Sequence, residues 1–388
     1  MNVPKLRFKE FNDEWRQINL KETFIYLSTN SLSREQLSDK GILKNLHYGD
    51  IHRKYNSIVN ENDDITTYVK DLNYINKYEK IKENDLIFAD ASEDYDGIGK
   101  AVEVINIKND TISGLHTILA REKEKIFAPM FKGYYFNSYI IHNQIRVLAN
   151  GFKVYGISKD SINKLNVKIP TINEQKKIAN TLNLLDKKIE LQSRKIEDLK
   201  LFTKKLETQY IFNSNNEYNK KRIDEIFNVK AGGDLNKNNI SFIKTPLFCY
   251  PIYSNNLEMN GLYGYSDIYK IGEESITVTG RGDIGKAIKR EGKYYPIVRL
   301  LVLIPKISVN LIYMQEAINN LKLIQESTGV PQLTAPQISK YKVSYPTLDI
   351  QNEYGDILLL LQEKIKYEIS KAEKLQQLKK GLMQSMFV

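Results

Sequence analysis

The sequence predicts an α+β protein with two small β-rich domains, each followed by a long helix, the two helices pairing as an antiparallel coiled coil. The chain has 388 residues, which is too long for one ordinary hydrophobic core. One segment occurs twice, and each copy has the heptad pattern of a long helix. Strand-like stretches separated by Gly, Asn and Asp turns precede each copy.

The strand patterns and the duplication predict where the domains begin and end. We expect strands at residues 86–89, 101–107, 144–149, 275–279 and 297–304. The predicted order is a first domain at 1–160, a first spacer strand and helix at 161–213, a second domain at 214–337, and a second spacer strand and helix at 338–388. The polar stretch 213–221 (NSNNEYNKK) has the composition of a linker.

The duplicated segment is the strongest signal in the chain. Residues 162–212 align without a gap to residues 338–388. Each copy has a short strand pattern ending in Pro, then a Thr that can cap a helix, then a long run without Pro. Glu174 completes a capping-box pattern with Thr171, whereas Asp349 and Ile350 precede Gln351 in the second copy and predict a weaker cap.

Apolar residues in both copies recur at spacings of four and three, which is the pattern of a coiled-coil seam. The more economical partner for each stripe is the other copy, because antiparallel pairing buries both. Helices of ~35–40 residues would be ~55–60 Å long at 1.5 Å per residue. The polar residues Gln192 and Glu368 interrupt the stripes and would set the register. The predicted seam comprises Leu182, Leu185, Ile189, Ile196, Leu199, Leu358, Leu361, Ile365, Leu375 and Leu382.

Composition limits the kinds of partner and compartment. There are 57 Lys and Arg against 47 Asp and Glu, a net charge of +10, which favours a polyanion such as nucleic acid. A general enrichment in Lys would raise this charge without any ligand. The single cysteine, Cys249, fits a reducing cytoplasm, where we expect the protein to act. The longest apolar run, 297–305, contains Arg299 and is too short to cross a membrane, so no membrane association is expected.

The sequence contains no arrangement of residues typical of a catalytic or metal-binding site. Residues 280–287 (GRGDIGKA) match the start of a phosphate-binding loop, but Ala287 stands where a Ser or Thr would hold Mg²⁺. A tight turn between two strands is the better interpretation, and a weaker copy at 97–101 supports it. The four histidines have no metal-ligand spacing, and His116 is interpreted as a polar residue of a turn. We expect no catalytic residue, no metal and no cofactor in this chain.

Polar and aromatic turns are the candidate nucleic-acid contacts. Arg can bond to guanine and Asn to adenine, and backbone amides in such turns can hold phosphates. Ordinary turn chemistry also places Gly, Asn and Ser at these positions, so each residue alone is a weak candidate. The candidates are His52, Arg53, Lys54 and Tyr55 in the first domain, and Ser254, Asn255, Asn256, Arg281 and Lys286 in the second.

These features together resemble the DNA-specificity subunits of Type I restriction–modification systems. The resemblance covers essentially the whole chain. It depends on the order and repetition of the following motifs: 3–11 (VPKLRFKEF) followed by Glu14 and Trp15, Ile169 and Pro170 with 174–178 (EQKKI), 185–189 (LDKKI), 329–333 (GVPQL) ahead of Tyr345 and Pro346, and 377–384 (QLKKGLMQ).

The resemblance implies a non-enzymatic subunit that binds double-stranded DNA. Each domain would be a target-recognition domain that reads one half of a bipartite site. Two modification subunits, which bind S-adenosylmethionine and methylate adenine, and restriction subunits that use ATP and Mg²⁺ would join it.

Three alternatives are consistent with the same sequence. A coiled-coil scaffold without sequence preference would bind DNA with only a shallow salt dependence. A specificity subunit of a related system would associate with other partners. An NTP-dependent enzyme would use 280–286.

Overall fold

The computed structural model describes residues 3–61, 65–74, 78–211, 218–321, 323 and 331–388. These residues divide into two compact units, unit 1 with residues 1–193 and 370–388 and unit 2 with residues 194–369. Part of the predicted linker, 213–217, and the first two residues of the motif at 329–333 lie outside the described residues. Among the helices that are described, none is long and apolar enough to cross a membrane.

The central sheets of the two units have the same strand order. In unit 1 it is β2 (Phe24–Leu27), β11 (Thr117–Glu122), β7 (Leu86–Ala89) and β9 (Ala101–Ile105), with β5 (Ile58–Asn60) added parallel to β9. In unit 2 it is β15 (Phe227–Ala231), β21 (Leu301–Pro305), β18 (Ser275–Val278) and β19 (Ala287–Arg290). All neighbours in these two four-strand sets are antiparallel, so the duplication extends from the helices to the domains.

Smaller sheets distinguish the units and join them to their helices. Unit 1 carries β10 (Thr111–Ser113), β4 (Lys44–Leu46), β6 (Tyr68–Val69) and β3 (Leu37–Ser38), whereas unit 2 carries β17 (Leu262–Ser266), β16 (Tyr250–Tyr253) and β20 (Tyr295–Pro296). The strand before each long helix pairs with the strand that opens the domain. These pairs are β1 (Arg16–Ile18) with β13 (Val167–Ile169) and β14 (Asn219–Arg222) with β22 (Lys342–Tyr345).

Three of the five predicted strands are confirmed as β7, β9 and β18, and two predictions need correction. Residues 144–148 lie in helix α5 (Tyr139–Leu148) and Ala149 is its C-cap; Ile141 and Ile145 are buried, but Val147 is 84% exposed. The burial follows a helical spacing of four, so the apparent alternation was misleading. The strand expected at 297–304 begins only at Leu301, because residues 297–300 form a turn in which Arg299 has a φ of 72°.

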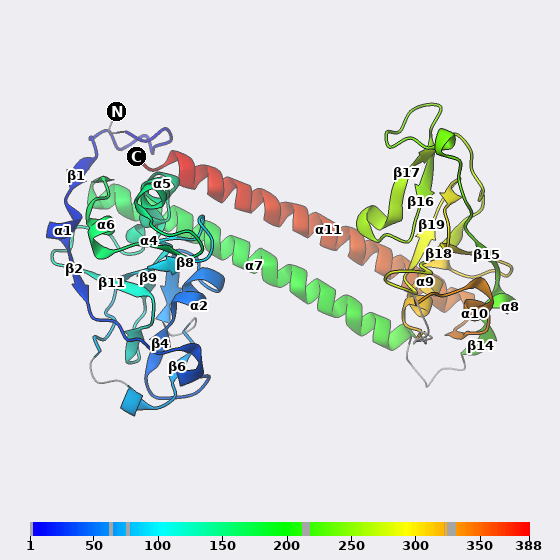
Figure 1. Cartoon of the computed structure of the whole chain (residues 1–388), viewed down its shortest axis with the longest axis horizontal. Coiled ribbons are helices and arrows are strands. Elements are labelled where there is room, and N and C mark those ends of the chain that lie inside the picture. Colours follow the sequence, from blue (N-terminus) through cyan, green and yellow to red (C-terminus); the bar gives the residue numbers. More distant parts are fainter. Residues whose placement is uncertain (1–2, 62–64, 75–77, 212–217, 322, 324–330) are drawn as a thin grey trace. The chain divides into compact units, whose positions relative to one another are not determined.

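The long helices are α7 (Ile172–Ile211) and α11 (Leu348–Ser385), and they are antiparallel (Figure 1). In unit 2, Lys195 forms an ion pair of 2.6 Å with Glu368, and the Tyr210 hydroxyl donates to Glu353 at 3.0 Å. The two contacts pair later residues of α7 with earlier residues of α11, so the helices run in opposite directions. In unit 1, Lys379 pairs with Asp186 at 2.5 Å.

The residues of the predicted seam are buried or half-buried along both helices. Leu182 and Leu358 lie in the cores of units 1 and 2, respectively, so each helix extends a domain core at its N-terminal end. Glu368 is 1% exposed and is also contacted by Lys364 at 3.3 Å, so the polar interruption of the stripe is a buried charge held between two lysines.

A buried glutamine joins each long helix to its domain. Gln175 donates to the carbonyl of Pro170 at 3.0 Å and accepts from the amide of Ala128 at 2.8 Å. Its repeat equivalent, Gln351, donates to the carbonyl of Pro346 at 2.9 Å and accepts from the amide of Asn310 at 3.0 Å. The second helix thus has the same joint as the first, although its predicted capping box is incomplete.

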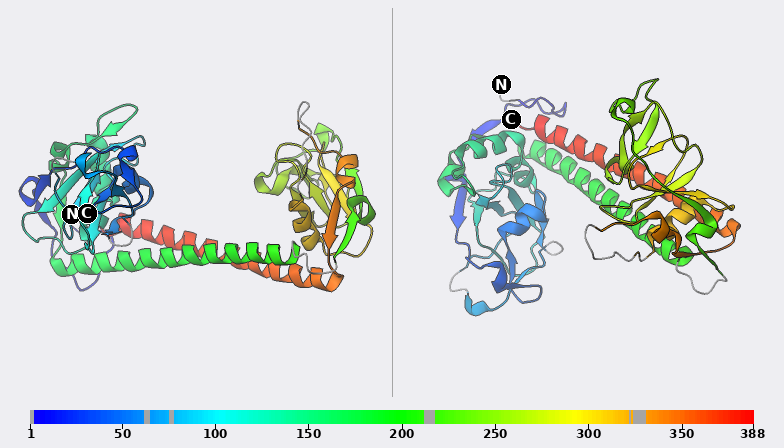
Figure 2. Two further views of the ribbon diagram at one scale, coloured as in Figure 1. Left: turned by 90° about the horizontal axis from the view of Figure 1, so that it is seen from below. Right: turned by 45° about the vertical axis from the view of Figure 1, so that its right-hand side comes forward.

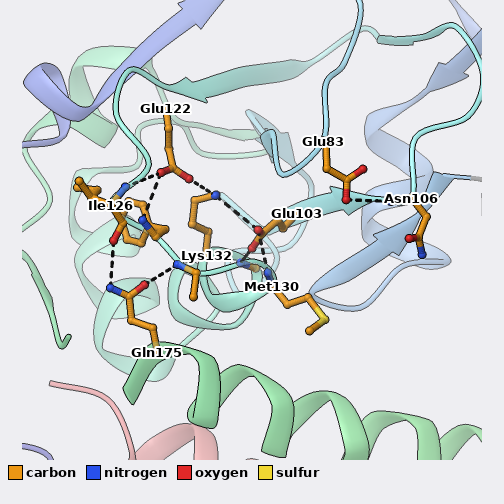
Figure 3. Close-up of polar contacts among 11 residues, drawn as sticks. Glu83, Glu103, Asn106, Glu122, Ile126, Met130, Lys132 and Gln175 are labelled. Carbon is orange, nitrogen blue, oxygen red and sulfur yellow. Dashed lines mark hydrogen bonds and ion pairs between the residues drawn. The ribbon is translucent and has the colours of Figure 1, made fainter. Parts of the chain in front are cut away.

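In unit 1 this joint has a polar support (Figure 3). Gln175 also donates to the carbonyl of Ile126 in the loop after β11. Glu122 accepts from the amides of that loop, and Lys132, 1% exposed, lies between Glu122 and the fully buried Glu103. Each buried charge therefore has an opposite partner, which is required for such groups to be tolerated in a core.

Glu174 does not act as the capping-box residue that the sequence predicts. Its carboxylate, 1% exposed, accepts two hydrogen bonds from the Arg7 guanidinium at 2.7 and 2.8 Å. Such a bidentate pair ties the segment before β1 to the first turn of α7.

Both ends of the described chain lie against unit 1 beside the start of α7, as the views of Figures 1 and 2 agree. The amide of Leu6 donates to the carbonyl of Ser385 at 2.9 Å. Phe387 is 2% exposed and packs against the rings of Phe131 and Tyr135. The last turn of α11 is therefore part of the unit 1 core.

Replacing Gln175 by Ala removes both ends of the joint and leaves the amide of Ala128 buried without its partner. We expect a loss of about 2–3 kcal/mol in the free energy of unfolding, measured by urea denaturation of the full chain. Gln376→Ala, at an exposed position of α11, is the matched control and should change stability by less than about 0.5 kcal/mol. Equal stability of the two variants would show that the hydrogen bonds of Gln175 do not stabilise the attachment of α7 to its domain.

Candidate nucleic-acid interface

The glycine-rich segment of unit 2 is a loop between two antiparallel strands, as the sequence predicts. It joins β18 to β19, and the Thr279 amide donates to the carbonyl of Lys286 at 3.0 Å. Because a strand follows the loop, no helix N-terminus receives a phosphate there. The side chains of Arg281 and Lys286 are exposed at this loop.

Asn255 organises the surroundings of that loop. Its side-chain oxygen accepts from the amide of Gly280 at 2.8 Å, and its side-chain nitrogen donates to the carbonyl of Val298 at 3.1 Å. Asn255 therefore holds two neighbouring loops. Ser254 and Asn256 bond within their own turn, where Asn256 is exposed.

In unit 1 the four predicted contacts lie at the end of helix α2 (Tyr48–Arg53), and their roles differ. His52 bonds through Nε2 to the carbonyl of Ala91 at 2.9 Å. Arg53 and Lys54 are exposed, and Lys54 lies 3.3 Å from the carboxylate of Asp50. Tyr55 is 5% exposed in a hydrophobic core, so the prediction that it is a surface contact is wrong.

The repeated sequence Ile-Gly-Lys-Ala makes the same backbone contact at its alanine in both units, but its lysine has different surroundings. The amides of Ala101 and Ala287 donate to the side-chain oxygens of Asn137 and Asn319, respectively. Lys100 in unit 1, however, donates to the carbonyls of His52 and Tyr55 and so satisfies the end of α2. The side chain of its repeat equivalent in unit 2, Lys286, is exposed.

Sequence reasoning missed two polar features that depend on tertiary contacts. Arg290 is 5% exposed, with its guanidinium 3.7 Å from the centre of the Tyr253 ring, and burial lowers the pKa of this group. In unit 1, a hollow of about 430 Å³ is lined by residues that include Asp90, His116 and Tyr155. Burial raises the pKa of Asp90, whose carboxylate lies 3.2 Å from the His116 ring.

The chemistry of these surfaces is that of polar recognition. The exposed candidates are Arg, Lys and Asn side chains on loops and at a helix end, whereas His52 and Asn255 bond within their domains. Within the described residues, no group of three or more His, Cys, Asp or Glu side chains is placed to hold a metal ion. The fold defines a protein with two related domains, each joined to one of two paired long helices.

The chain belongs to the family of the Type I restriction modification DNA specificity domain. The family model matches twice, at residues 12–201 and 215–380, so both units are copies of the same domain.

Related proteins agree with this assignment. Two type I specificity subunits of Mycoplasma pneumoniae are 36% and 33% identical to this chain over 115 residues, 30% of this chain. The matches span about a third of each relative, 32% and 34% of their lengths. The fold is that of the type I restriction-modification S subunit from M. genitalium, with a TM-score of 0.64 at 17% identity over 100% of this chain and 99% of that one.

Removing the Asn255 side chain should loosen the glycine-rich loop without unfolding unit 2. In Asn255→Ala the Gly280 amide loses its acceptor, and since such a bond contributes about 1 kcal/mol, its hydrogen exchange should be roughly fivefold faster. Asn256→Ala, one residue away, provides the control and should leave that exchange rate unchanged. The same rate in all three proteins would show that Asn255 does not order the loop.

Proposed function

We propose that this chain is the non-catalytic specificity subunit of a type I restriction–modification system, acts in the cytoplasm, and reads a bipartite site in double-stranded DNA. The observation that carries the proposal is the duplication of a DNA-specificity domain with one sheet order in both units. Each unit would read one half-site. The net charge of +10 supports binding to a polyanion.

The paired helices support a fixed gap between the half-sites. Antiparallel helices that each begin in one domain core and end in the other unit act as a spacer of constant length. Domains related in this way can face grooves about one helical turn of DNA, ~34 Å, apart while the base pairs between are not read.

Two equivalent apolar stripes support recruitment of two copies of one partner. Leu184 and Leu191 of α7 are 66% and 65% exposed, and their repeat equivalents Leu360 and Tyr367 of α11 are 68% and 62% exposed. Residues one heptad apart lie on the same face of a helix, and contiguous exposed apolar surface marks protein interfaces. We assign these stripes to two modification subunits, which would supply S-adenosylmethionine-dependent methylation. Restriction subunits with ATP and Mg²⁺ would join the same complex.

Binding-site selection with the full chain tests the reading of DNA. We expect two short conserved half-sites at one fixed separation and a steep fall of affinity with salt. A scaffold without sequence preference would select no motif, and that result would contradict the proposal. Copurification with a methyltransferase separates a type I subunit from a specificity subunit of another system.

A longer spacer should lengthen the preferred gap. Inserting seven residues after Ser193 and seven after Ile369 keeps the heptad phase and adds about 10 Å, or about three base pairs. The measurement is the gap recovered by binding-site selection. Insertion into α7 alone breaks the pairing and should abolish selection of the bipartite site. An unchanged gap in the double-insertion variant would show that the length of the helices does not set the separation of the half-sites.

Each apolar stripe should hold one modification subunit. Leu184→Lys with Leu191→Lys should remove one of two copies from the complex, and Leu360→Lys with Tyr367→Lys the other, as counted by native mass spectrometry. Glu197→Lys changes the charge at an exposed position of α7 and should leave both copies bound. Retention of both copies in both double variants would contradict this assignment.

A further inference from the structure

Two turns with unrelated sequences occupy the same place in the central sheets of the two units. Ala101 and Ala287, the equivalent alanines of the Ile-Gly-Lys-Ala repeats, pair with Phe88 of β7 and Val278 of β18. Phe88 in turn pairs with Ile118, and Val278 with Leu301. Counting back two residues along β11 and β21 gives His116 and Arg299, which are therefore equivalent.

Both residues have a left-handed backbone. The φ angles are 53° at His116 and 72° at Arg299. Among the non-glycine residues with positive φ in the described chain, these are the two with basic side chains. Glycine adopts this conformation freely, whereas a residue with a Cβ is disfavoured there. Both units have a basic residue rather than glycine at this disfavoured position, although the surrounding sequences differ, and this indicates a role for the side chain itself.

Their internal contacts orient these side chains and leave polar atoms available for a ligand. His116 bonds through Nδ1 to Asp90 at 3.2 Å and is 50% exposed. Arg299 donates from one guanidinium nitrogen to the side chain of Gln332, a neutral partner that does not compensate its charge. Within the described part of the chain, Nε2 of His116 has no hydrogen-bond partner.

Each of these turns adjoins one of the surfaces described above. His116 lines the hollow of unit 1 with Asp90, and Tyr48 of α2 contacts its ring edge-on at 5.3 Å. In unit 2 the carbonyl of Val298, the residue before Arg299, accepts from Asn255, which also holds the glycine-rich loop. The two basic residues therefore project from the places where the candidate recognition loops meet.

We propose that His116 and Arg299 are equivalent base-reading residues, one for each half-site, and that Arg299 contacts a guanine. The inference rests on the proposed function. A guanidinium can donate two bonds to the O6 and N7 atoms of guanine in the major groove. The His116 ring, oriented by Asp90, presents Nε2 to one base edge. Loss of either residue should therefore change the recognised sequence at one position in one half-site.

Substitution by glycine separates this role from a structural one. In His116→Gly and Arg299→Gly the backbone strain is relieved, so the melting temperature should stay the same or rise. Binding-site selection with the full chain should lose preference at one base pair, by roughly tenfold or more, in the first half-site for one variant and in the second for the other. Asn106→Gly, at another left-handed residue with a φ of 57° beyond the opposite end of the β7–β9 pair, should leave both half-sites unchanged.

The outcomes distinguish this inference from the proposed function. If the wild-type chain selects no motif, the proposed function itself fails. A wild-type motif that both glycine variants retain would overturn the base-reading role alone. A uniform loss across all sequences with a shallower salt dependence would indicate phosphate contacts and would also overturn it. So would a lower melting temperature with weakened selection of both half-sites.

Discussion

Each long helix is fixed at its first turn by a buried glutamine, and the architecture depends on this joint. The amide of Gln175 or Gln351 donates to the proline carbonyl before the helix and accepts from an amide of the domain. Because the group is neutral, it makes both bonds without the cost of burying a charge. In a helix of 40 residues, a change of 10° at the first turn would displace the last turn by about 10 Å.

The two units share a frame and differ in the loops that it carries. The asparagine contact to Ala101 or Ala287 and the sheet order are the same, whereas the lysine before each alanine satisfies a helix end in unit 1 and is exposed in unit 2. The additional four-stranded and three-stranded sheets belong to one unit each. A scaffold held by backbone contacts can therefore accept different surface residues without losing its fold.

The features that the sequence predicts well are those with a period or a repeat. The heptad seam and the duplication each recur at many positions along the chain, so a single exception does not obscure them. The contacts that the sequence does not reveal are those between residues far apart in the chain. Arg7 bonds to Glu174, and nothing near either residue indicates the other.

The sequence-based predictions that were wrong within the candidate surfaces have the same cause. Tyr55 looks like a turn residue but is buried by tertiary packing, and the turn at Arg299 was hidden in an apolar run. His116 and Arg299 become equivalent only when strand register is known, since their sequences share no motif.

The burial of Phe387 in unit 1 has a consequence for synthesis on the ribosome. The core that this ring completes contains residues from Trp15 to Leu182, yet Phe387 is made only after all of unit 2. Unit 2 can assemble its own sheet while unit 1 still exposes the aromatic surface around Phe131 and Tyr135. The domain translated first therefore completes its core only when the last residues of the chain have been made.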